Sequence, residues 1–436
     1  MSRVSAISQM YPPTPGWTEK DISDLSDKVY IVTGSNAGVG KEVAKILYSK
    51  NATVYAAARN EEKNLAAINA TKEAFPSSTG RLEHLHLDLG DLNTIKKSAE
   101  TFLSKEKKLH VLFNNAGVML PPQGSKTAQG YELQLGTNCV GPFLFTKLLT
   151  PLLIETAKTA PKDSVRVVWV SSSAAEALSP KNGLDVDNLD YSKDDGVYMN
   201  KLGGKYGVSK AGNYYHATEY ARRHREDGVI SIALNPGNLA SDLDRHIYLV
   251  QKLLLKWLIT YPPIHGAYTE LFAGISDQLT LEKSGGWIVP WGRFSEMRAD
   301  LVSGSKLESE GGSGIAQKFW EWSEDQVRAY VQASFDTRIL PPQGNFSYYA
   351  ANHLGEYADP QLKHFWPGTI PDPDVYEPPF PTYFGDFRTE PIFSIAFSAL
   401  VNPGADTTFV GKNANDGTND KTAALPESSY VYPSDE

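Results

Sequence analysis

Two kinds of hydrophobic pattern alternate between residues 28 and 331 of the chain. Short apolar runs rich in β-branched residues are typical of buried strands, whereas apolar residues that recur every three or four positions are typical of amphipathic helices. The pattern predicts strands at residues 28–33, 52–58, 81–87, 109–113, 164–171, 229–234 and 286–289. It predicts helices at residues 41–50, 61–75, 91–107, 136–157, 205–225 and 315–331.

The order of these elements predicts how the strands pair. Strands that alternate with helices pair in parallel, and right-handed crossovers between them build a doubly wound sheet. The run Val165–Val170 is apolar except for one arginine, as expected of a strand that helices cover on both faces. We therefore expect an α/β fold with a Rossmann-like, doubly wound parallel sheet of about seven strands and helices on both faces.

Composition divides the 436 residues into three parts. Residues 1–24 lack the alternating pattern, and Tyr11-Pro12-Pro13-Thr14-Pro15 predicts an extended N-terminal arm. Residues 25–331 form the α/β domain. Residues 332–436 hold 13 of the 27 prolines and 5 basic against 14 acidic residues, which supplies the whole net charge of −9. We expect an acidic, Pro-rich, irregular and partly disordered extension there, although its aromatic residues leave open that it packs on the domain or on another subunit.

Composition also excludes several classes of protein. Residues 1–331 contain 37 basic and 37 acidic residues, so no basic surface points to a nucleic acid partner. Cys139 is the only cysteine, which rules out an intrachain disulfide. No apolar run reaches the roughly 18 residues of a membrane span, and the N-terminus lacks the apolar core of a signal peptide. We expect a soluble, cytoplasmic protein, with no metal site because His84 and His86 have no clustered carboxylates beside them.

A glycine-rich turn follows the first predicted strand and opens the first helix. Gly34 allows the tight turn, Gly38 lets the backbone approach a pyrophosphate, and Gly40 permits close packing of helix and strand. The helix N-terminus offers free N–H groups to phosphates. A generic glycine loop is the alternative, but the position between strand and helix favours a dinucleotide site. The residues of this predicted site are Gly34, Ser35, Asn36, Gly38, Val39 and Gly40.

The end of the second predicted strand indicates which dinucleotide is bound. An NAD site usually has an acidic residue there that bonds the ribose 2′-hydroxyl. This strand ends Ala57-Ala58-Arg59-Asn60 and offers no acid. The guanidinium of Arg59 could hold a 2′-phosphate, and a solvated surface arginine is the alternative. We therefore expect NADP(H) as the cofactor.

Tyr206 and Lys210 stand four residues apart on a predicted helix, so the phenol and the ammonium share one helix face. A free tyrosine has a pKa of about 10, and a neighbouring cation favours the phenolate and lowers that pKa. The pair could then donate a proton to a carbonyl oxygen or accept one from an alcohol. By itself this spacing is common by chance and also fits an exposed helix pair.

Other polar groups accompany this pair at the ends of predicted strands or on the helices beside them, where open α/β sheets bind ligands. They stand in Asn114-Asn115-Ala116-Gly117, Thr137-Asn138-Cys139-Val140-Gly141, Ser171-Ser172-Ser173 and Asn235-Pro236-Gly237. In this order, with the glycine turn and the Tyr206–Lys210 pair, they resemble the motifs of the short-chain dehydrogenase/reductase family. The resemblance covers about residues 25–330 and is closest to NADP-dependent, retinol-dehydrogenase-like members and to fungal reductases of secondary metabolism.

The resemblance implies a role for each of these residues. Tyr206 would be the proton donor or acceptor, Lys210 would lower its pKa and bond the nicotinamide ribose, and Ser172 would hold the substrate oxygen. Asn138 would position a water in the proton relay. The other residues would contact the cofactor: Asn114, Asn115, Ala116, Gly117 and Asp88 on the adenosine side, and Pro236, Gly237 and Ser241 around the nicotinamide.

These roles predict reversible hydride transfer between NADPH and a hydrophobic ketone, aldehyde or secondary alcohol. Residues 174–205 form a long insertion that should line the substrate entrance, and residues of about 241–280 correspond to the family's substrate lid. The apolar stretch 249–259 has interspersed lysines and also fits a membrane-surface helix, which would give peripheral membrane association. The family usually forms homodimers or homotetramers. The alternative function is a non-catalytic dinucleotide-binding protein whose C-terminal tail recruits a partner.

Overall fold

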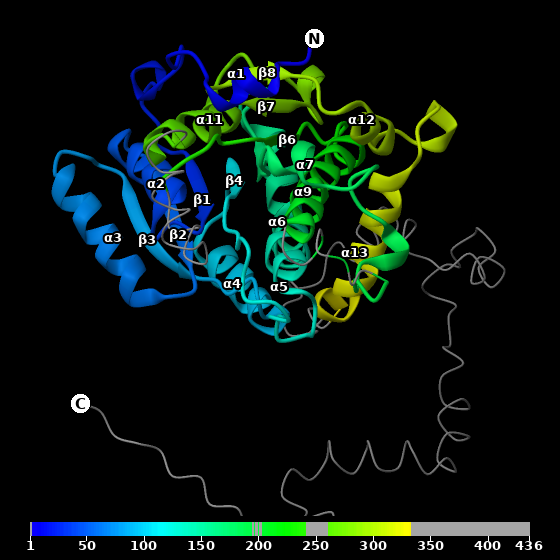
Figure 1. Ribbon diagram of the computed structural model, residues 1–436. Helices are drawn as coiled ribbons and strands as arrows, with labels where there is room; N and C mark the ends of the chain where they lie inside the picture. The colour runs from blue at the N-terminus through cyan, green and yellow to red at the C-terminus, as the bar shows by residue number, and fades with distance from the viewer. Residues whose placement is uncertain (1, 194–195, 197–198, 200–202, 241–259, 333–436) are drawn as a thin grey trace, which may run out of the picture. The chain divides into compact units, whose positions relative to one another are not determined.

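The computed structural model describes residues 2–193, 196, 199, 203–240 and 260–332. Eight strands form one sheet in the order β3-β2-β1-β4-β5-β6-β7-β8 (Figure 1). Neighbouring strands are parallel except β7 and β8, which are antiparallel. The strands are β1 Val29–Thr33, β2 Thr53–Ala58, β3 Arg81–His86, β4 Val111–Asn114, β5 Arg166–Val170, β6 Ile230–Leu234, β7 Trp287–Val289 and β8 Arg293–Ser295. This confirms the doubly wound α/β fold and adds one strand to the seven expected.

Helices cover both faces of the sheet (Figure 1). Alternate residues of β1 belong to different hydrophobic clusters, Tyr30 and Val32 to one and Val29 and Ile31 to the other, so the strand is buried on both faces. The first cluster includes α2 and α11, and the second includes α4, α6, α9 and α13. The helices are α1 Ala6–Met10, α2 Gly38–Ser49, α3 Glu61–Ala74, α4 Leu92–Lys105, α5 Leu133–Leu135, α6 Gly141–Thr159, α7 Ala174–Ala177, α9 Gly204–Arg223, α11 Pro263–Ile275, α12 Ala299–Ser305 and α13 Ile315–Gln332.

The hydrophobic pattern does not predict α1 or α11. Helix α1 lies in the N-terminal arm that was expected to be extended. Helix α11 falls within the range 241–280 expected as a lid, yet its Ala267 and Leu271 are fully buried in the core. The 263–275 part of the expected lid is therefore a core helix. Residues 241–259 lie outside the described residues, as does nearly all of the C-terminal extension at 332–436.

One helical stretch, Leu133–Thr159, is long and apolar enough to cross a membrane by length and composition alone. It consists of α5, the π-helical turn η2 Gly136–Val140, and α6. Most of it is buried inside the protein, and its Leu149 and Leu153 have no exposed surface. Because it packs in one of the two core clusters, it is a core helix of the layer that flanks one face of the sheet.

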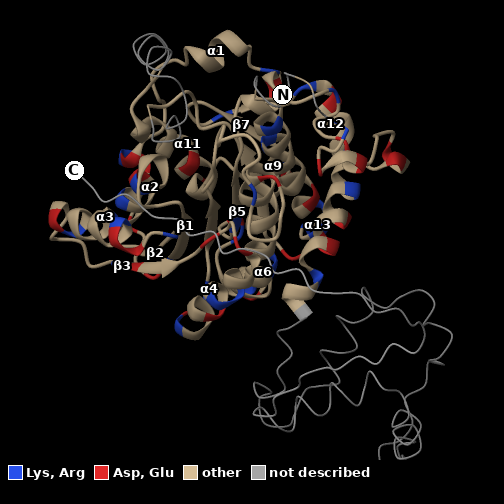
Figure 2. Ribbon diagram, turned by 60° about the horizontal axis from the view of Figure 1, so that its bottom comes forward, with Lys and Arg blue, Asp and Glu red and all other residues tan. Residues whose placement is uncertain are grey.

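Charged side chains are interspersed by sign on the outer helices. Figure 2 shows acidic and basic positions side by side on α3, α4 and α13. Some of them pair along one helix, as Lys158 does with Glu155 and Arg328 with Asp325. This distribution agrees with the expectation that nucleic acid is not a partner.

The edge of the sheet at the amino ends of the strands is held by Arg166 of β5. Its guanidinium donates to the carbonyl oxygens of Ala273, Ser276 and Leu279 at 3.1, 2.7 and 3.2 Å, which anchors the end of α11. Burial lowers the pKa of Arg166 to about 10. The arginine therefore joins one central strand to a helix through bonds that use the carbonyl groups a helix end leaves free.

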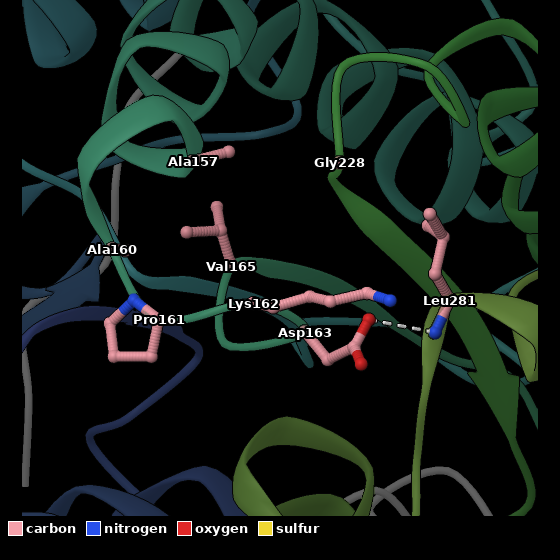
Figure 3. Close-up of a pocket in the computed structure, with 8 residues that line it drawn as sticks. All are labelled: Ala157, Ala160, Pro161, Lys162, Asp163, Val165, Gly228 and Leu281. Atoms are coloured by element: carbon pink, nitrogen blue, oxygen red, sulfur yellow. Dashed lines mark hydrogen bonds between the residues drawn. The ribbon is translucent and has the colours of Figure 1, made fainter.

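A pocket of about 230 Å³ opens at this same edge (Figure 3). Asp163 Oδ1 accepts a hydrogen bond of 3.0 Å from the Leu281 N–H across it. The pocket is lined by Ala157, Ala160, Pro161, Lys162, Asp163, Val165, Gly228 and Leu281. None of the predicted site residues lines it, so the candidate chemistry lies at the opposite edge.

Candidate active site

The glycine turn lies between β1 and α2, as the sequence predicted. Gly34 and Gly38 have φ angles of +70° and +58°, a region that favours glycine. A Cβ on Gly40 would stand 2.7 Å from the carbonyl oxygen of Gly34, so a side chain there would force helix and strand apart. Ala37, which precedes α2, provides no side-chain cap and leaves the first N–H groups of the helix to an anion. The turn therefore fits the phosphates of a dinucleotide.

Asn115 and Ala116 close the other side of this turn. Asn115 Nδ2 donates to the Thr33 carbonyl oxygen at 2.6 Å, and the Ala116 N–H donates to Thr33 Oγ1 at 2.9 Å. Ser35 Oγ lies 3.4 Å from Asn64 Oδ1 in the interior, so only the backbone of Ser35 can meet a cofactor. These bonds hold the ends of β1 and β4 together beneath the turn.

Three more residues of the predicted cofactor site have different surroundings. Asn36 is half-buried on the turn itself. Val39 is buried and lies close to Gly266 of α11. Asn114 is buried, and its Nδ2 donates to Thr146 Oγ1 at 2.8 Å. Asn114 therefore joins the end of β4 to α6 behind the site, and its side chain is not exposed to a cofactor.

Arg59 and Asp88 lie just beyond the ends of β2 and β3. Arg59 Nη1 is 4.0 Å from Asp88 Oδ2, and the Arg59 side chain is 76% exposed. Asp88 Oδ1 accepts a hydrogen bond of 2.9 Å from the Gly90 N–H, which fixes the carboxylate. The guanidinium is accessible to a phosphate at the sheet edge where the predicted dinucleotide site lies. The roles of both residues stay predictions.

Tyr206 and Lys210 lie on α9, beside the end of β5. The Tyr206 side chain is buried and shares a hydrogen bond with Ser172, the second residue after β5. Lys210 Nζ donates to the Val170 carbonyl oxygen at 2.8 Å and lies 5.7 Å from the centre of the Tyr206 ring. Ser171 Oγ donates to the Lys210 carbonyl oxygen at 2.6 Å and ties the helix to the strand. The fold thus brings together the phenol, the ammonium and the serine.

Burial controls the protonation of this pair. It raises the pKa of Tyr206 to about 12, although the hydrogen bond with Ser172 acts in the opposite direction. Burial also lowers the pKa of Lys210 to about 8. The sequence predicted a lowered pKa for Tyr206; the structure gives the opposite, because loss of solvation destabilises the phenolate more than the hydrogen bond with Ser172 stabilises it. A phenol that stays protonated at neutral pH is suited to donate a proton.

Asn138 lies in the π-helical turn η2, and such turns are frequent at functional sites. Its Nδ2 donates to the Val118 carbonyl oxygen and to Ser209 Oγ, both at 3.0 Å, and its Oδ1 accepts from the Val118 N–H at 2.8 Å. A Cβ on Gly117 would lie 3.1 Å from Asn138 Oδ1 and 3.4 Å from Lys210 Nζ, so Gly117 allows this close approach. The Oδ1 atom has a second lone pair, which leaves Asn138 an acceptor for a water.

Comparison with known proteins identifies the family. Residues 28–183 match the family described as short chain dehydrogenase. A short-chain dehydrogenase/reductase of Phomopsis amygdali is 54% identical over 331 residues, which covers 75% of this chain and 97% of that protein. The chain belongs to the short-chain dehydrogenase/reductase family. It is therefore an oxidoreductase.

Two further comparisons agree with this assignment. The short-chain dehydrogenase/reductase pkfC of Emericella nidulans is 50% identical over 320 residues, covering 73% of this chain and 98% of that protein. A crystal structure of an uncharacterized protein from Mycobacterium paratuberculosis superposes with a TM-score of 0.51 at 25% identity, covering 72% of this chain and 98% of that one. Both of these proteins are matched over almost their whole length, so about a quarter of this short-chain dehydrogenase/reductase has no counterpart in either of them.

The loop after β6 carries Pro236 and Gly237, which the family resemblance places near the nicotinamide. Gly237 has a φ of +100°, and a Cβ there would stand 2.7 Å from the ring of Trp291. The Gly237 N–H donates to Asn235 Oδ1 at 3.0 Å. A side chain at this position would be strained and would strike the indole, so the loop requires glycine. Ser241, the last of the predicted cofactor residues, lies outside the described residues.

Glu270 is a buried group near the site that the sequence analysis missed. It lies on α11 between Gly266, next to the glycine turn, and Gly274, which packs on Phe113. Its side chain is fully buried, and neither carboxylate oxygen has a hydrogen-bond partner in the described part of the chain. Burial raises the pKa of Glu270 to about 8, while the charge of Lys210 acts to lower it. The sequence did carry a signal for this residue: it is a glutamate that stands one helical turn from each of two glycines in a mostly apolar helix.

Proposed function

We propose that this short-chain dehydrogenase/reductase uses NADP(H) to reduce a hydrophobic ketone or aldehyde to the alcohol, in secondary metabolism. The observation that supports it most is the meeting of Tyr206, Ser172, Lys210 and Asn138 at the carboxyl edge of the sheet, beside the glycine turn. Arg59, exposed beyond the end of β2 where an NAD site would carry an acid, supports NADP over NAD. The 54% and 50% identical relatives are fungal proteins.

The chain's own residues fit such a cofactor. The glycine turn and the uncapped start of α2 would receive the pyrophosphate, and the Pro236–Gly237 loop would border the nicotinamide. When bound, the nicotinamide supplies the hydride that reaches the carbonyl carbon. Lys210, buried with its ammonium on the Val170 carbonyl oxygen, would bond the ribose of that group.

Proton transfer is assigned to Tyr206. Its hydroxyl is protonated at neutral pH and would give a proton to the substrate oxygen as negative charge grows there. Ser172 Oγ, which shares a hydrogen bond with the phenol, would hold the same oxygen and stabilise that charge. Asn138, through a water, would help to return a proton toward the site after each turnover.

The test is turnover with NADPH and a panel of hydrophobic ketones and aldehydes, followed by the loss of nicotinamide absorbance. Tyr206→Phe removes the proton donor and should lower turnover by about 10²- to 10⁴-fold. Tyr214→Phe is the matched control, because Tyr214 is also buried on α9 but bonds Ser305, away from the site. It should leave turnover close to that of the parent. Equal measurable rates in the parent and the Tyr206→Phe protein would overturn the proton role, whereas no turnover by the parent would favour a dinucleotide-binding protein without catalysis.

A further inference from the structure

The N-terminal helix α1 has an inverted pattern of burial. Ile7 and Tyr11 are apolar or aromatic but 76% and 54% exposed, whereas the polar Gln9 is only 5% exposed. Hydrophobic burial therefore contributes little to the folding of this segment onto the domain, because it is confined to the half-buried Val4. Hydrogen bonds of Gln9 and its neighbours hold the segment on the domain, since a buried polar group costs free energy unless it is paired.

Both ends of the Gln9 amide are paired with groups far away in the sequence. Gln9 Nε2 donates to Glu176 Oε2 at 2.9 Å and to the Val4 carbonyl oxygen at 3.3 Å. Gln9 Oε1 accepts from Asn235 Nδ2 at 3.0 Å. Asn235 is 2% exposed, and the carboxylate of Glu176 is 8% exposed. One side chain thus bridges two segments that the sequence separates by 59 residues.

These two segments carry residues of the active site. Glu176 is in α7, four residues after Ser172, whose Oγ accepts from the N–H that opens this helix at 3.2 Å. Asn235 follows β6, and its Oδ1 accepts from the Gly237 N–H at 3.0 Å. Gln9 therefore connects the segment of the substrate-binding serine with the loop that borders the nicotinamide.

Other contacts hold the N-terminal segment in place. Arg3 Nη2 donates to Glu176 Oε1 at 2.9 Å, so the carboxylate is held by two residues of the segment. Arg293 of β8 donates to Ser8 Oγ and to the Ser8 carbonyl oxygen at 2.8 and 2.7 Å. The Val4 N–H donates to Ser295 Oγ at 2.9 Å. Figure 1 shows α1 lying along β7 and β8, where these bonds place it.

We propose that residues 3–10 act as a strap that fixes the Ser172 segment relative to the Pro236–Gly237 loop, with Gln9 as the positioning residue. The strap rests on the proposed function, because it matters only if Ser172 holds the substrate oxygen while the loop borders the nicotinamide. A small shift between the two segments then moves the carbonyl carbon out of line for hydride transfer. Misplacement of this kind lowers kcat and leaves NADPH affinity largely intact.

The test exchanges donor and acceptor across the strap. Q9E places a carboxylate against Glu176 and should lower kcat by roughly ten- to a hundredfold, with little change in NADPH affinity. Q9E combined with E176Q restores the pairing, because the amide introduced at position 176 can donate to the carboxylate introduced at position 9, which still accepts from Asn235. The double variant should recover most of the kcat that Q9E alone loses. Ile7→Ala is the matched control, since Ile7 is on the same helix and points to solvent.

Amide hydrogen exchange supplies a readout that is independent of turnover. In Q9E the N–H of Gly237 should exchange faster, and in the double variant it should return toward the parental rate. A Q9E protein with parental kcat, or a loss of kcat that E176Q does not rescue, overturns the strap. The proposed function is tested separately, because the strap variants do not test it. A fully active Tyr206→Phe protein would overturn the proposed function.

Discussion

The two edges of the sheet differ in how completely their polar groups are paired. At the amino edge Arg166 donates to four carbonyl oxygens, and Asp163 accepts from a backbone N–H across the pocket. At the carboxyl edge α2 begins without a side-chain cap, and Glu270 has no hydrogen-bond partner among the described residues. Open α/β sheets bind ligands at the carboxyl edge, so the N–H groups at the start of α2 are available to a ligand, whereas the buried carboxyl group of Glu270 is not exposed to one.

The comparison also shows that a cavity alone does not locate the chemistry. The 230 Å³ pocket lies at the amino edge among residues such as Ala157, Pro161 and Val165, and none of its described lining residues is a buried proton donor. The carboxyl edge carries the buried phenol and ammonium on one helix turn. Substitutions at the amino edge should therefore change stability, and those at the carboxyl edge should change ligand binding or turnover.

The largest change in stability is expected at the amino edge. Arg166→Met leaves three buried carbonyl oxygens without their donor and should lower the free energy of unfolding by about 3 kcal/mol or more. Arg225→Met is the control, because Arg225 is exposed and donates to one carbonyl oxygen at 3.3 Å; its effect should be about 0.5 kcal/mol or less. Denaturant unfolding measures both. If the Arg166→Met protein lost turnover per folded molecule, the amino edge would not serve stability alone, and the assignment of catalysis to the carboxyl edge would be contradicted.

The next effect is the pH dependence that Glu270 gives to stability. Its pKa is about 8 in the folded protein against a usual 4.5, so the folded state holds an extra proton between those values. The contribution of Glu270 to the free energy of unfolding should therefore fall as pH rises through this range, by about 3 kcal/mol from pH 5 to pH 8. The buried His110 and His216, with pKa values of about 4 and about 3 against a usual 6.5, act with the opposite sign in the lower half of this range. Lys210, with a pKa of about 8 against 10.5, acts with the opposite sign from the upper end of this range upward.

Glu270→Gln removes this titration. The free energy of unfolding of the variant relative to that of the parent should rise by the same amount between pH 5 and pH 8, since the amide binds no proton. The comparison is made on one protein preparation at constant ionic strength. Parallel pH profiles in the variant and the parent would show that the carboxyl group of Glu270 does not titrate in this range.

The smallest effect concerns the choice of cofactor. Arg59→Ala removes the exposed guanidinium at the end of β2. It should weaken the binding of NADPH by about ten- to a hundredfold and leave the affinity for NADH unchanged. Asn60→Ala is the neighbouring control: Asn60 caps α3 through the Lys63 N–H, so it should cost about 1 kcal/mol of stability without altering the NADPH to NADH ratio. Titration by nicotinamide fluorescence measures both affinities. If Arg59→Ala weakened the binding of NADPH and of NADH equally, the assignment of Arg59 to the 2′-phosphate would be wrong.

Local pattern was sufficient for most of the fold. The strands of the core, such as Arg166–Val170, are continuous apolar runs, and their alternation with helices implied the parallel sheet. The pattern did not find β8, because three residues that return from a tight turn carry no periodic signal. It also did not find α1, whose buried residue is a glutamine and whose apolar residues face solvent.

The candidate site was predicted less completely. The spacing of Tyr206 and Lys210 and the glycine turn depend on local geometry, which a sequence carries directly. Burial of a polar group depends on elements distant in the chain, so the sequence could not show that Glu270 and Gln9 are buried, and the pKa of Tyr206 moved opposite to expectation. The residues that the sequence missed are those whose partners come from elsewhere in the fold.

The short strand β8 ends the sheet, and the N-terminal segment lies against it through Arg293 and Ser295. An uncovered edge strand is a template on which a second chain can add its own strand. Shortening the protein from its N-terminus would therefore favour self-association, and a truncated preparation should aggregate at concentrations at which the intact chain stays dispersed.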